Sequence, residues 1–431
     1  MAPRKAAYYT LGCKLNFAET GSLAALLKER GVERAGVGET PDVIVVNSCS
    51  VTAEADRKCR SLIRSLHRRH PAADIIVTGC YAQLRPMEVA ALEGVSMVVG
   101  INDKLSIARY ALGETPGPAA IPEARELREF MPSCSRGDRT RYFLKVQDGC
   151  NNWCTYCTIP AARGRSRSPE IGFLLGQARE VAAQGGKEIV LTGVNIGDFG
   201  WGKPERFIDL IRALDEVEGI ERYRISSIEP DLLTDEIIDF VATSRRFMPH
   251  FHIPLQCGSD EVLRLMRRRY GTGLFAEKIA RVRERMPEAF IGVDLIVGAR
   301  GESEALFEES RAFVDSLPIS RLHVFPYSER PGTRALTDID LVVSQEEKRR
   351  RMHVMTELSA AKQREFSAAF SGTVRPMLVE HVTHGRTGGF TDNYLRVELD
   401  APRPDLANRV VNVRLGALSP EGDKFSGEIE L

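Results

Sequence analysis

Three cysteines stand close together in the middle of the chain. Residues 148–157 read DGCNNWCTYC, which places Cys150, Cys154 and Cys157 at the spacing C-x3-C-x2-C in a chain with only nine cysteines. A zinc site normally takes four protein ligands, and no further cysteine or histidine follows at a zinc-like spacing. Three thiolates suit a four-iron cluster with one open iron. A zinc knuckle that borrows a distant ligand is the alternative.

The open iron of such a cluster needs another ligand. In chemistry of this type the amino and carboxylate groups of S-adenosylmethionine (SAM) chelate it, and an electron passed to the sulfonium releases a 5′-deoxyadenosyl radical. The cofactor carries the difficult chemistry, and the protein orients and shields it. The pattern C-x3-C-x-Y-C, with Tyr156 before the third cysteine, resembles the radical SAM superfamily. The resemblance implies that the backbone of Tyr156 lies near the methionyl amine.

A second group of cysteines is spread along the first hundred residues. Cys13, Cys49 and Cys80 each end a strand-like run, in TLGCKLN, VNSCSVT and VTGCYAQ. In a parallel sheet these ends share one edge beside helix N-termini, where the helix dipole favours thiolates. We therefore expect the three thiols to meet and to hold a second cluster with an open iron. Separate buried core cysteines are the alternative.

The elements that must position these cysteines alternate between strands and helices. Strand-like runs separated by helical patterns predict a parallel sheet at the N-terminus; they lie at 5–13, 42–49, 74–80 and 95–100. Six more runs, each but the last followed by a helical pattern, predict a partial barrel with its site at the carboxyl ends of the strands; they lie at 141–149, 188–196, 222–230, 250–256, 290–298 and 321–328. A long basic helix and short strand-like runs follow.

The fold class is therefore α/β, in several parts. At roughly 100–200 residues per domain, the 431 residues predict about three domains. We expect a Rossmann-like parallel sheet domain at 1–115, a linker rich in proline and glycine at 116–135, a partial (β/α)6 barrel at 136–366 and a small all-β barrel at 367–431.

Bulk composition is that of an ordinary globular protein, with 43% hydrophobic and 27% charged residues. The N-terminus has no signal-peptide hydrophobic region, and no stretch approaches about 18 apolar residues. We expect a cytoplasmic protein with no membrane segment. In a reducing compartment, clustered cysteines are ligands or redox groups more often than disulfides.

The formal net charge is zero, which argues against a protein that coats nucleic acid. Basic residues nevertheless gather in runs at 57–70, 163–168, 267–269 and 348–351. Most are arginines, which bind phosphates in bidentate fashion. Taken singly, such a run is more often a solvated helix face than a binding site.

The two cysteine groups, in this order, resemble the methylthiotransferases, which have an N-terminal methylthiotransferase domain, a radical SAM core and a C-terminal TRAM domain. The similarity covers essentially the whole chain. It is greatest to the MtaB-type branch in YYTLGCKLNFAET, NSCSVTAEADRKCR, VTGCYAQ, FLKVQDGCNNWCTYCTIPAARGRSRS, EIVLTGVNIG, RISSIEP, HIPLQCGSD and HVFPYSERPGT. That branch acts on N6-threonylcarbamoyladenosine on the 3′ side of the tRNA anticodon and leaves the 2-methylthio derivative.

The resemblance implies roles for particular residues. Cys150, Cys154 and Cys157 would hold the 4Fe-4S cluster that cleaves SAM, and the other group an auxiliary 4Fe-4S cluster that carries the inserted sulfur. Contacts with SAM are implied at Tyr156, Thr192, Gly193, Ser227, Glu229, Gln256 and Asp294. For such strand-end residues the alternative is a satisfied polar residue at the barrel mouth. An adenine C2–H bond is too strong for side-chain acid–base chemistry, so a radical site fits this substrate.

The implied partners are a tRNA anticodon stem-loop, a reducing electron donor of the flavodoxin or ferredoxin type, and a sulfur donor. Phosphate contacts position RNA, and unpaired loop bases can splay outward. We expect phosphate contacts from the TRAM-like module and the run after the cluster: Arg163, Arg165, Arg167, Arg375, Arg386 and Arg396.

Related branches leave the substrate open. One acts on isopentenylated adenosine and another on an aspartate of a ribosomal protein. A non-enzymatic alternative is an iron–sulfur, RNA-binding redox protein.

The sequence departs from the family in one loop. DLIVGARGES stands where relatives usually read Gly-Phe-Pro-Gly-Glu-Thr, so Ala299 and Arg300 replace an aromatic residue and a proline. Loss of a proline frees the backbone, which leaves the conformation of this loop open. Cys257 stands where a serine is usual, and we expect it to be inert; Cys59 and Cys134 are expected in the core or at the surface.

Overall fold

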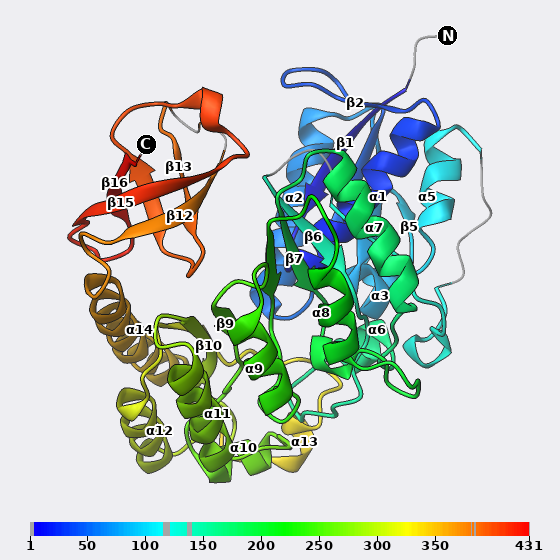
Figure 1. Cartoon of the computed structure of the whole chain (residues 1–431). Coiled ribbons are helices and arrows are strands. Elements are labelled where there is room, and N and C mark those ends of the chain that lie inside the picture. Colours follow the sequence, from blue (N-terminus) through cyan, green and yellow to red (C-terminus); the bar gives the residue numbers. More distant parts are fainter. Residues whose placement is uncertain (1–3, 115–120, 136–139, 381, 383–384, 431) are drawn as a thin grey trace.

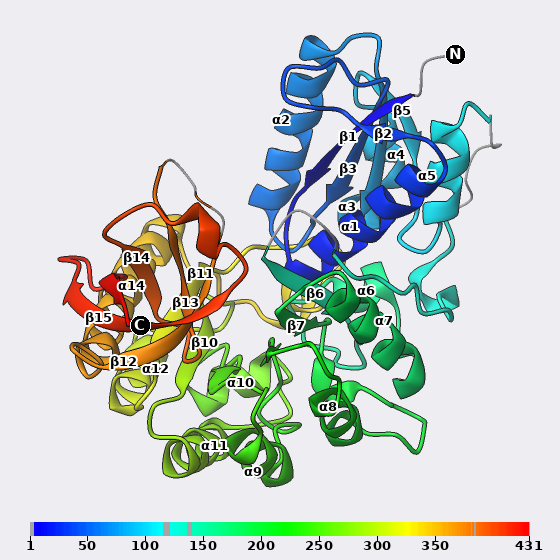
Figure 2. The ribbon, with the colours of Figure 1, turned by 45° about the horizontal axis from the view of Figure 1, so that its top comes forward.

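The computed structural model describes residues 4–114, 121–135, 140–380, 382 and 385–430 (Figure 1). Two α/β units follow one another along the chain, and a β-barrel lies beside them at the C-terminal end (Figures 1 and 2). None of the helices in these ranges combines the length and the apolarity that a membrane crossing requires.

The N-terminal unit is a five-stranded parallel sheet. Its strands run in the order β2-β1-β3-β4-β5, with bounds β1 (Lys5–Thr10), β2 (Glu33–Arg34), β3 (Val43–Ser48), β4 (Asp74–Gly79) and β5 (Val95–Val98). The helices are α1 (Lys14–Glu29), α2 (Ala53–Arg69), α3 (Cys80–Leu84), α4 (Pro86–Ala90) and α5 (Lys104–Ala111). The apolar run VIVVNS is buried along all of β3, because helices cover both faces of the sheet.

The first of the basic runs forms helix α2. Its buried side chains recur every three or four residues, at Asp56, Cys59, Ile63 and Leu66, which is the spacing of one helix face. Thr52 caps the helix by accepting a hydrogen bond from the backbone N–H of Ala55. The arginines of this run therefore lie mainly on the solvent side.

The expected linker lies partly outside the described residues, and its visible part begins at residue 121. It contains a short 3-10 helix, η1 (Ala124–Glu126). Further along, Cys134 pairs with Leu144 in an isolated antiparallel bridge. This stretch thus leads onto the outer edge of the second unit.

The second unit contains the six predicted parallel strands. They are β6 (Arg141–Lys145), β7 (Glu188–Thr192), β8 (Arg222–Ile225), β9 (His250–His252), β10 (Phe290–Val297) and β11 (Arg321–Pro326). Two three-stranded sheets, β6-β7-β8 and β9-β10-β11, are joined by a parallel bridge between Ser227 and His252. The predicted partial barrel is confirmed.

Helices cover the outer side of this barrel. They are α7 (Ile171–Ala183), α8 (Phe207–Asp215), α9 (Asp235–Thr243), α10 (Asp260–Leu265), α11 (Thr272–Arg285), α12 (Glu304–Ser316) and α14 (Gln345–Ala368), with a 3-10 turn η2 (Ile196–Asp198). Two short helices lie elsewhere: α6 (Ile159–Arg163) packs against α3, and α13 (Ala335–Asp338) lies against Thr155. Leu144, Leu191 and Leu295 belong to the large core between strands and helices. Residues one position away on the same strands, such as Lys145 and Asp294, turn to the inner side.

Helix α1 of the N-terminal unit lies against the inner side of the barrel. Its residues Phe17 and Ala18 pack with Phe143 of β6 and Val190 of β7. Cys13 directly precedes this helix. The contact therefore carries the start of α1 toward the barrel interior.

The C-terminal unit is a closed barrel with the order β12-β13-β14-β16-β15. Its strands are β12 (Val374–Val379), β13 (Gly388–Thr391), β14 (Arg396–Leu399), β15 (Val410–Leu418) and β16 (Phe425–Ile429), with a 3-10 turn η3 (Pro404–Leu406). The buried Arg224 of β8 donates 2.7 Å hydrogen bonds to the carbonyls of Thr391 and Asp392. This barrel is thus docked on the radical SAM-like unit and matches the expected TRAM-like module.

Candidate active site

The middle cysteine group lies at the carboxyl end of β6, and each of its sulfurs accepts one N–H. The backbone N–H of Asn152 donates to Cys150 at 3.3 Å, and that of Ile159 donates to Cys157 at 3.4 Å. Arg268 donates to Cys154 at 3.1 Å. Hydrogen bonds to thiolate sulfur tune iron–sulfur clusters, so this loop has the donors that such a cluster uses.

Burial holds these cysteines in the thiol form when no metal is present. Burial and, next, the charges of neighbouring sulfurs raise the pKa of Cys150 and of Cys157 to about 12. The pKa of Cys154 is raised by burial too, against the charge of Arg268. A metal-bound thiol must be deprotonated, so iron must supply the positive charge that stabilises these thiolates.

Two glycines bring the N-terminal cysteines together. Gly12 has φ +99°, and a Cβ there would lie 2.7 Å from the Cβ of Cys49. Gly79 has φ +95°, and its Cβ would lie 2.3 Å from the carbonyl oxygen of Ser48. Only glycine allows both the left-handed backbone and this close approach. The loops that carry Cys13 and Cys80 therefore lie close to Cys49 and to Ser48 beside it.

The electrostatics of this second group also reflect close contact. Burial raises the pKa of Cys80 to about 12, opposed by the charge and a hydrogen bond of Arg163 and supported by Cys49 and Cys13. Burial raises the pKa of Cys49, where Cys13 is again a neighbour. None of these thiols forms a disulfide.

No three metal-ligating side chains in the described part of the chain converge as ligands of a single ion. Each thiolate of a four-iron cluster binds a different iron. Of the N-terminal group, Cys13 is exposed and Cys49 and Cys80 are buried.

Helix α6 joins the two cysteine groups. It begins two residues after Cys157, and its Ala162 packs with Cys80 and Leu84 at the start and end of α3. Cys157 and Leu84 also line the same cavity, of about 140 Å³. The carboxyl edge of the N-terminal sheet thus faces the cluster loop of the barrel.

The loop after β7, where SAM contacts were expected, is tightly held. Thr192 is buried at the end of the strand. A Cβ at Gly193 would lie 2.9 Å from Oε1 of Gln147, and that oxygen accepts the backbone N–H groups of Val194 and Asn195. Gln147 was missed by sequence reasoning, although it stands in the quoted run before Cys150.

Glu229 and Tyr156 meet around an arginine that the sequence did not single out. Arg268 forms an ion pair with Glu229, donates to the Tyr156 hydroxyl at 3.4 Å and lies over the ring of Tyr270 at 4.8 Å. Burial raises the pKa of Glu229, and Arg268 opposes this shift. Arg268 belongs to the basic run 267–269, which could have been read as a site signal.

Ser227 and Asp294 are connected through His252. The imidazole Nδ1 lies 2.9 Å from Ser227 Oγ, and Nε2 lies 2.8 Å from Asp294 Oδ1. With the ring neutral, Nε2–H donates to Asp294 and the Ser227 hydroxyl donates to Nδ1. Gln256 lies on the next loop with φ +69°, a strained backbone of the kind found at ligand sites. These side chains form one polar row across β8, β9 and β10.

The six arginines expected to contact RNA divide into two sets. Three are committed inside the protein: Arg163 and Arg167 in ion pairs with Asp148, and Arg375 in ion pairs with Glu288 and Asp392. Their guanidinium groups are at most 10% exposed, because the chain supplies carboxylates that pair with them.

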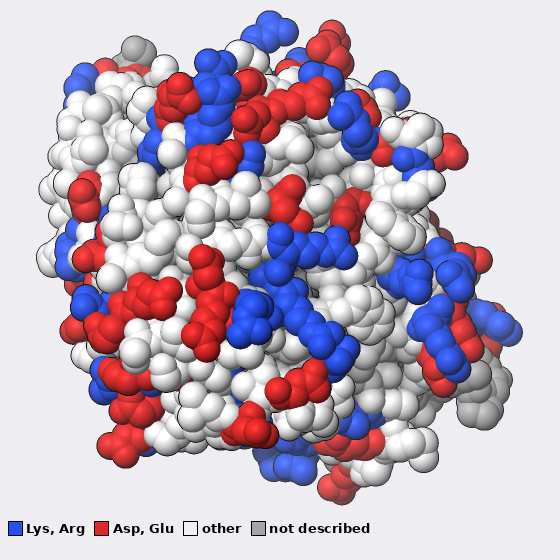
Figure 3. Space-filling view, turned by 90° about the horizontal axis from the view of Figure 1, so that it is seen from below, with Lys and Arg blue, Asp and Glu red and all other residues white. Residues whose placement is uncertain are grey.

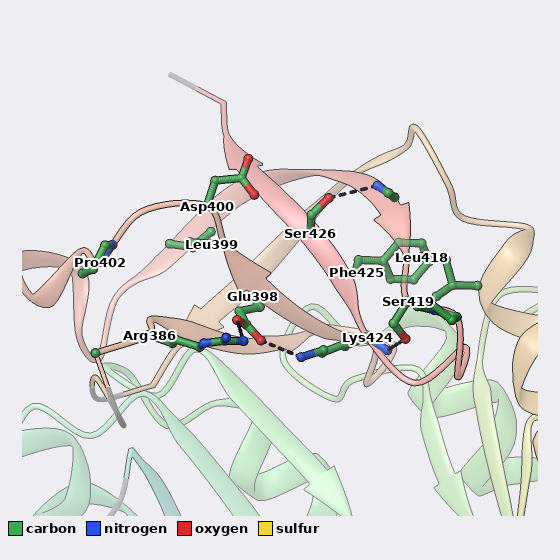
Figure 4. Close-up of a pocket in the computed structure, with 13 residues that line it drawn as sticks. Arg386, Glu398, Leu399, Asp400, Pro402, Leu418, Ser419, Lys424, Phe425 and Ser426 are labelled. Atoms are coloured by element: carbon green, nitrogen blue, oxygen red, sulfur yellow. Dashed lines mark hydrogen bonds and ion pairs between the residues drawn. The ribbon is translucent and has the colours of Figure 1, made fainter.

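The other three arginines, Arg165, Arg386 and Arg396, are exposed. Arg165 lines a hollow of about 510 Å³ with Arg125 and Arg128. Arg386 pairs with Glu398, which also binds Lys424, at a cavity of the C-terminal barrel (Figure 4). On the face seen from below, basic and acidic side chains are interspersed (Figure 3). On this face the basic side chains therefore form small separate groups and not one continuous basic surface.

The unusual loop at Ala299 and Arg300 is held by polar interactions of its own. Arg300 pairs with Glu329 at 2.6 Å and donates to the carbonyl of Ile339 at 2.9 Å. These bonds replace the restraint of the missing proline. Cys257 is fully buried, and its thiol donates to Ser310 at 3.7 Å.

Comparisons with known proteins agree with this architecture. The model of the radical SAM superfamily matches residues 144–314, and that of "Uncharacterized protein family UPF0004" matches residues 5–100. Among solved structures, the radical SAM methyltransferase TsrM from Kitasatospora setae aligns with a TM-score of 0.57 and 15% identity over 77% of this chain and 74% of that one. That likeness concerns the fold. The class is thus a radical SAM enzyme.

Relatives define the family further. The chain is 40% identical to the threonylcarbamoyladenosine tRNA methylthiotransferase MtaB of Bacillus subtilis (95% of this chain, 93% of the relative) and 35% identical to that of Aquifex aeolicus (91% and 96%). It is 35% identical to the tRNA-2-methylthio-N(6)-dimethylallyladenosine synthase of Thermobifida fusca (86% and 76%). The chain belongs to the radical SAM methylthiotransferase family, of MtaB type, and uses 4Fe-4S clusters and SAM.

Proposed function

We propose that this enzyme converts N6-threonylcarbamoyladenosine beside the tRNA anticodon to its 2-methylthio derivative. The observation that carries the chemistry is the meeting of two cysteine groups across α6, where Ala162 packs on Cys80. Transfer of sulfur to a carbon radical requires both centres at one place. The names of the relatives support the substrate, with the dimethylallyl branch as the second candidate.

The two groups would have different tasks. Cys150, Cys154 and Cys157 would hold the SAM-cleaving cluster, and Cys13, Cys49 and Cys80 the auxiliary cluster. When bound, SAM and the clusters supply the radical that removes the adenine C2 hydrogen and the sulfur that takes its place. The protein would orient these groups through N–H donors such as Asn152 and Arg268 and limit the access of water by burying Cys49, Cys80, Cys150 and Cys154.

Further partners follow from this reaction. The anticodon base must leave its stack to reach the site, so we place the stem-loop against the exposed arginines near the cluster loop and on the C-terminal barrel. A sulfur donor is required because the product gains sulfur. We place electron entry, from a flavodoxin- or ferredoxin-type donor, beside Cys157, which lines a cavity with Arg85 and Arg330. The cytoplasmic location stays a prediction.

Anaerobic turnover on anticodon stem-loop RNA tests the substrate. The RNA is supplied with the threonylcarbamoyl group, with a dimethylallyl group, or with unmodified adenosine, and nucleosides are identified by mass. We expect the methylthio product from the first RNA alone. Equal product from the dimethylallyl RNA would assign the enzyme to the other branch, and modification of a ribosomal protein instead would exclude tRNA.

Counting iron tests the assignment of the cysteines. Replacing Cys13, Cys49 and Cys80 by alanine should remove about four of eight irons and abolish methylthiolation, while 5′-deoxyadenosine still forms. Replacing the other three should abolish 5′-deoxyadenosine as well. If the first variant kept all its iron, the auxiliary cluster would lie elsewhere.

A further inference from the structure

Five buried charged side chains join the N-terminal unit to the barrel, and we call them the charge network. Lys145 binds Glu19 at 2.9 Å and Asp148 at 2.7 Å. Arg163 binds Glu19 at 3.1 Å and Asp148 at 3.0 Å, and Arg167 binds Asp148 at 3.0 Å. Four of the five side chains are at most 1% exposed, and Arg167 is 8% exposed.

The charge network carries an unbalanced positive charge. Among the described residues, three cations, Lys145, Arg163 and Arg167, contact two carboxylates, Glu19 and Asp148. A buried charge without a counter-ion costs several kcal/mol. The network is therefore best stabilised when a further anion lies beside it.

Within the charge network, Arg163 is the cation that lies near the N-terminal cysteines. Its second terminal nitrogen donates to Oδ1 of Asn16 at 2.8 Å, three residues after Cys13. Asn16 Oδ1 also lies 3.9 Å from the sulfur of Cys13, and Ala162 next to Arg163 packs on Cys80, where the charge of Arg163 opposes the rise in the pKa of the Cys80 thiol. Arg163 is also the last residue of α6, which begins just after Cys157.

We propose that Arg163 is a positioning residue that fixes the auxiliary-cluster cysteines relative to the SAM-cleaving loop and supplies the buried cation that balances the auxiliary cluster. The inference rests on the cysteine assignment made above. A cluster held by three thiolates is an anion, which is the counter-ion that the charge network lacks. The two remaining contacts of the guanidinium, to Asn16 and Glu19, tie α1 and hence Cys13 to the same point.

Two consequences separate this role from a purely structural one. A cation next to a cluster stabilises its reduced, more negative form, so Arg163 raises the reduction potential of the auxiliary cluster. It also sets the distance between the two centres, and a misplacement of about 1 Å can cost about a hundredfold in rate. Loss of Arg163 should therefore uncouple SAM cleavage from sulfur transfer.

The test uses the reconstituted enzyme with both clusters. Arg163→Gln should lower the potential of the auxiliary cluster, measured by EPR-monitored titration, and leave that of the SAM-cleaving cluster unchanged. Methylthiolation should fall about a hundredfold, while 5′-deoxyadenosine formation persists. Arg163→Lys should restore the potential of the auxiliary cluster, because the positive charge returns. It should restore methylthiolation only in part, because lysine cannot make all the contacts of the guanidinium. Glu19→Gln removes a negative charge and should raise the potential of the auxiliary cluster. This variant tests the same inference if Arg163→Gln does not fold.

Arg224→Gln is the matched control. Arg224 is equally buried in an ion pair with Glu188, but it faces the C-terminal barrel, so its loss should leave both potentials unchanged. An unaltered auxiliary potential in folded Arg163→Gln and Glu19→Gln proteins would overturn the inference, as would equal shifts of both clusters. Iron counts of the cysteine variants show separately whether the assignment itself fails.

Discussion

Arg268 places one terminal nitrogen 3.1 Å from the sulfur of Cys154 and pairs through the other with the carboxylate of Glu229. A cation is thus held between a cluster ligand and an acidic strand end. The carboxylate of SAM is an anion that is expected at the open iron of the same cluster. We therefore expect Arg268 to contact this carboxylate when SAM is bound.

Replacing Arg268 by glutamine should weaken SAM binding about tenfold to a hundredfold. A hydrogen bond to a charged group contributes about 1.5–3 kcal/mol, and about 1.4 kcal/mol is a factor of ten. The Kd of SAM for the reconstituted enzyme measures this. Arg267→Gln is the control, because Arg267 is half exposed and lies 3.6 Å from Asp338. Equal SAM affinity in both variants would remove Arg268 from the SAM site.

The exposed arginines should carry the electrostatic part of tRNA binding. Alanine at Arg128, Arg165, Arg386 and Arg396 should weaken binding and reduce the salt slope by about 0.7–0.9 for each phosphate that is no longer neutralised, while SAM cleavage survives. Binding of the anticodon stem-loop over a range of salt concentrations measures both. The exposed Arg179 of α7 provides the control variant. An unchanged slope would place the RNA on another face.

The contact between Asp56 and Arg330 should hold the N-terminal unit on the barrel. The two are 2.5 Å apart and nearly buried, and Arg330 also donates to Ser50 next to Cys49. Breaking a buried ion pair costs about 3–5 kcal/mol, so Asp56→Ala should lower the free energy of unfolding by that amount in urea titrations. Asp405→Ala removes an exposed pair with Arg403 and should cost no more than about 1 kcal/mol. Equal costs would contradict the docking role.

Stability should decline below about pH 6.5 because of buried histidines. Burial, aided by Arg224, holds the pKa of His250 well below its ordinary value of 6.5, and burial with the neighbouring His252 lowers that of His323 to about 4. Below pH 6.5 these two histidines bind protons in the unfolded chain but stay neutral in the folded chain. The free energy of unfolding is therefore highest above pH 6.5 and falls below it, by about 1.4 kcal/mol per pH unit for each histidine.

Urea titrations of the cluster-free protein between about pH 7 and pH 5 measure this slope. His250→Gln should halve the slope of the unfolding free energy against pH, because of these two histidines His323 then contributes by itself. A slope identical to that of the unchanged protein would show that His250 is protonated in the folded chain.

Local patterns determined most of the architecture. The six strands of the barrel and the main strands of the N-terminal sheet were predicted from the sequence. A strand is recognised from alternating apolar and polar residues, or from a continuous apolar run, and both patterns involve only neighbouring residues. The cysteine spacing around Cys154 and the strand ends at Cys13, Cys49 and Cys80 followed from the same local information. The two-residue strand β2 was missed because two residues carry no period.

The tertiary structure decided which polar residues serve the site and which serve the fold. The run at 163–168 reads as uniformly basic, yet Arg163 and Arg167 are buried with Asp148 while Arg165 is exposed. Nothing local distinguishes them, because the carboxylate of Glu19 that receives Arg163 lies 144 residues away in the chain. Burial and pairing are set by what the rest of the fold brings alongside, and only the assembled chain contains that information.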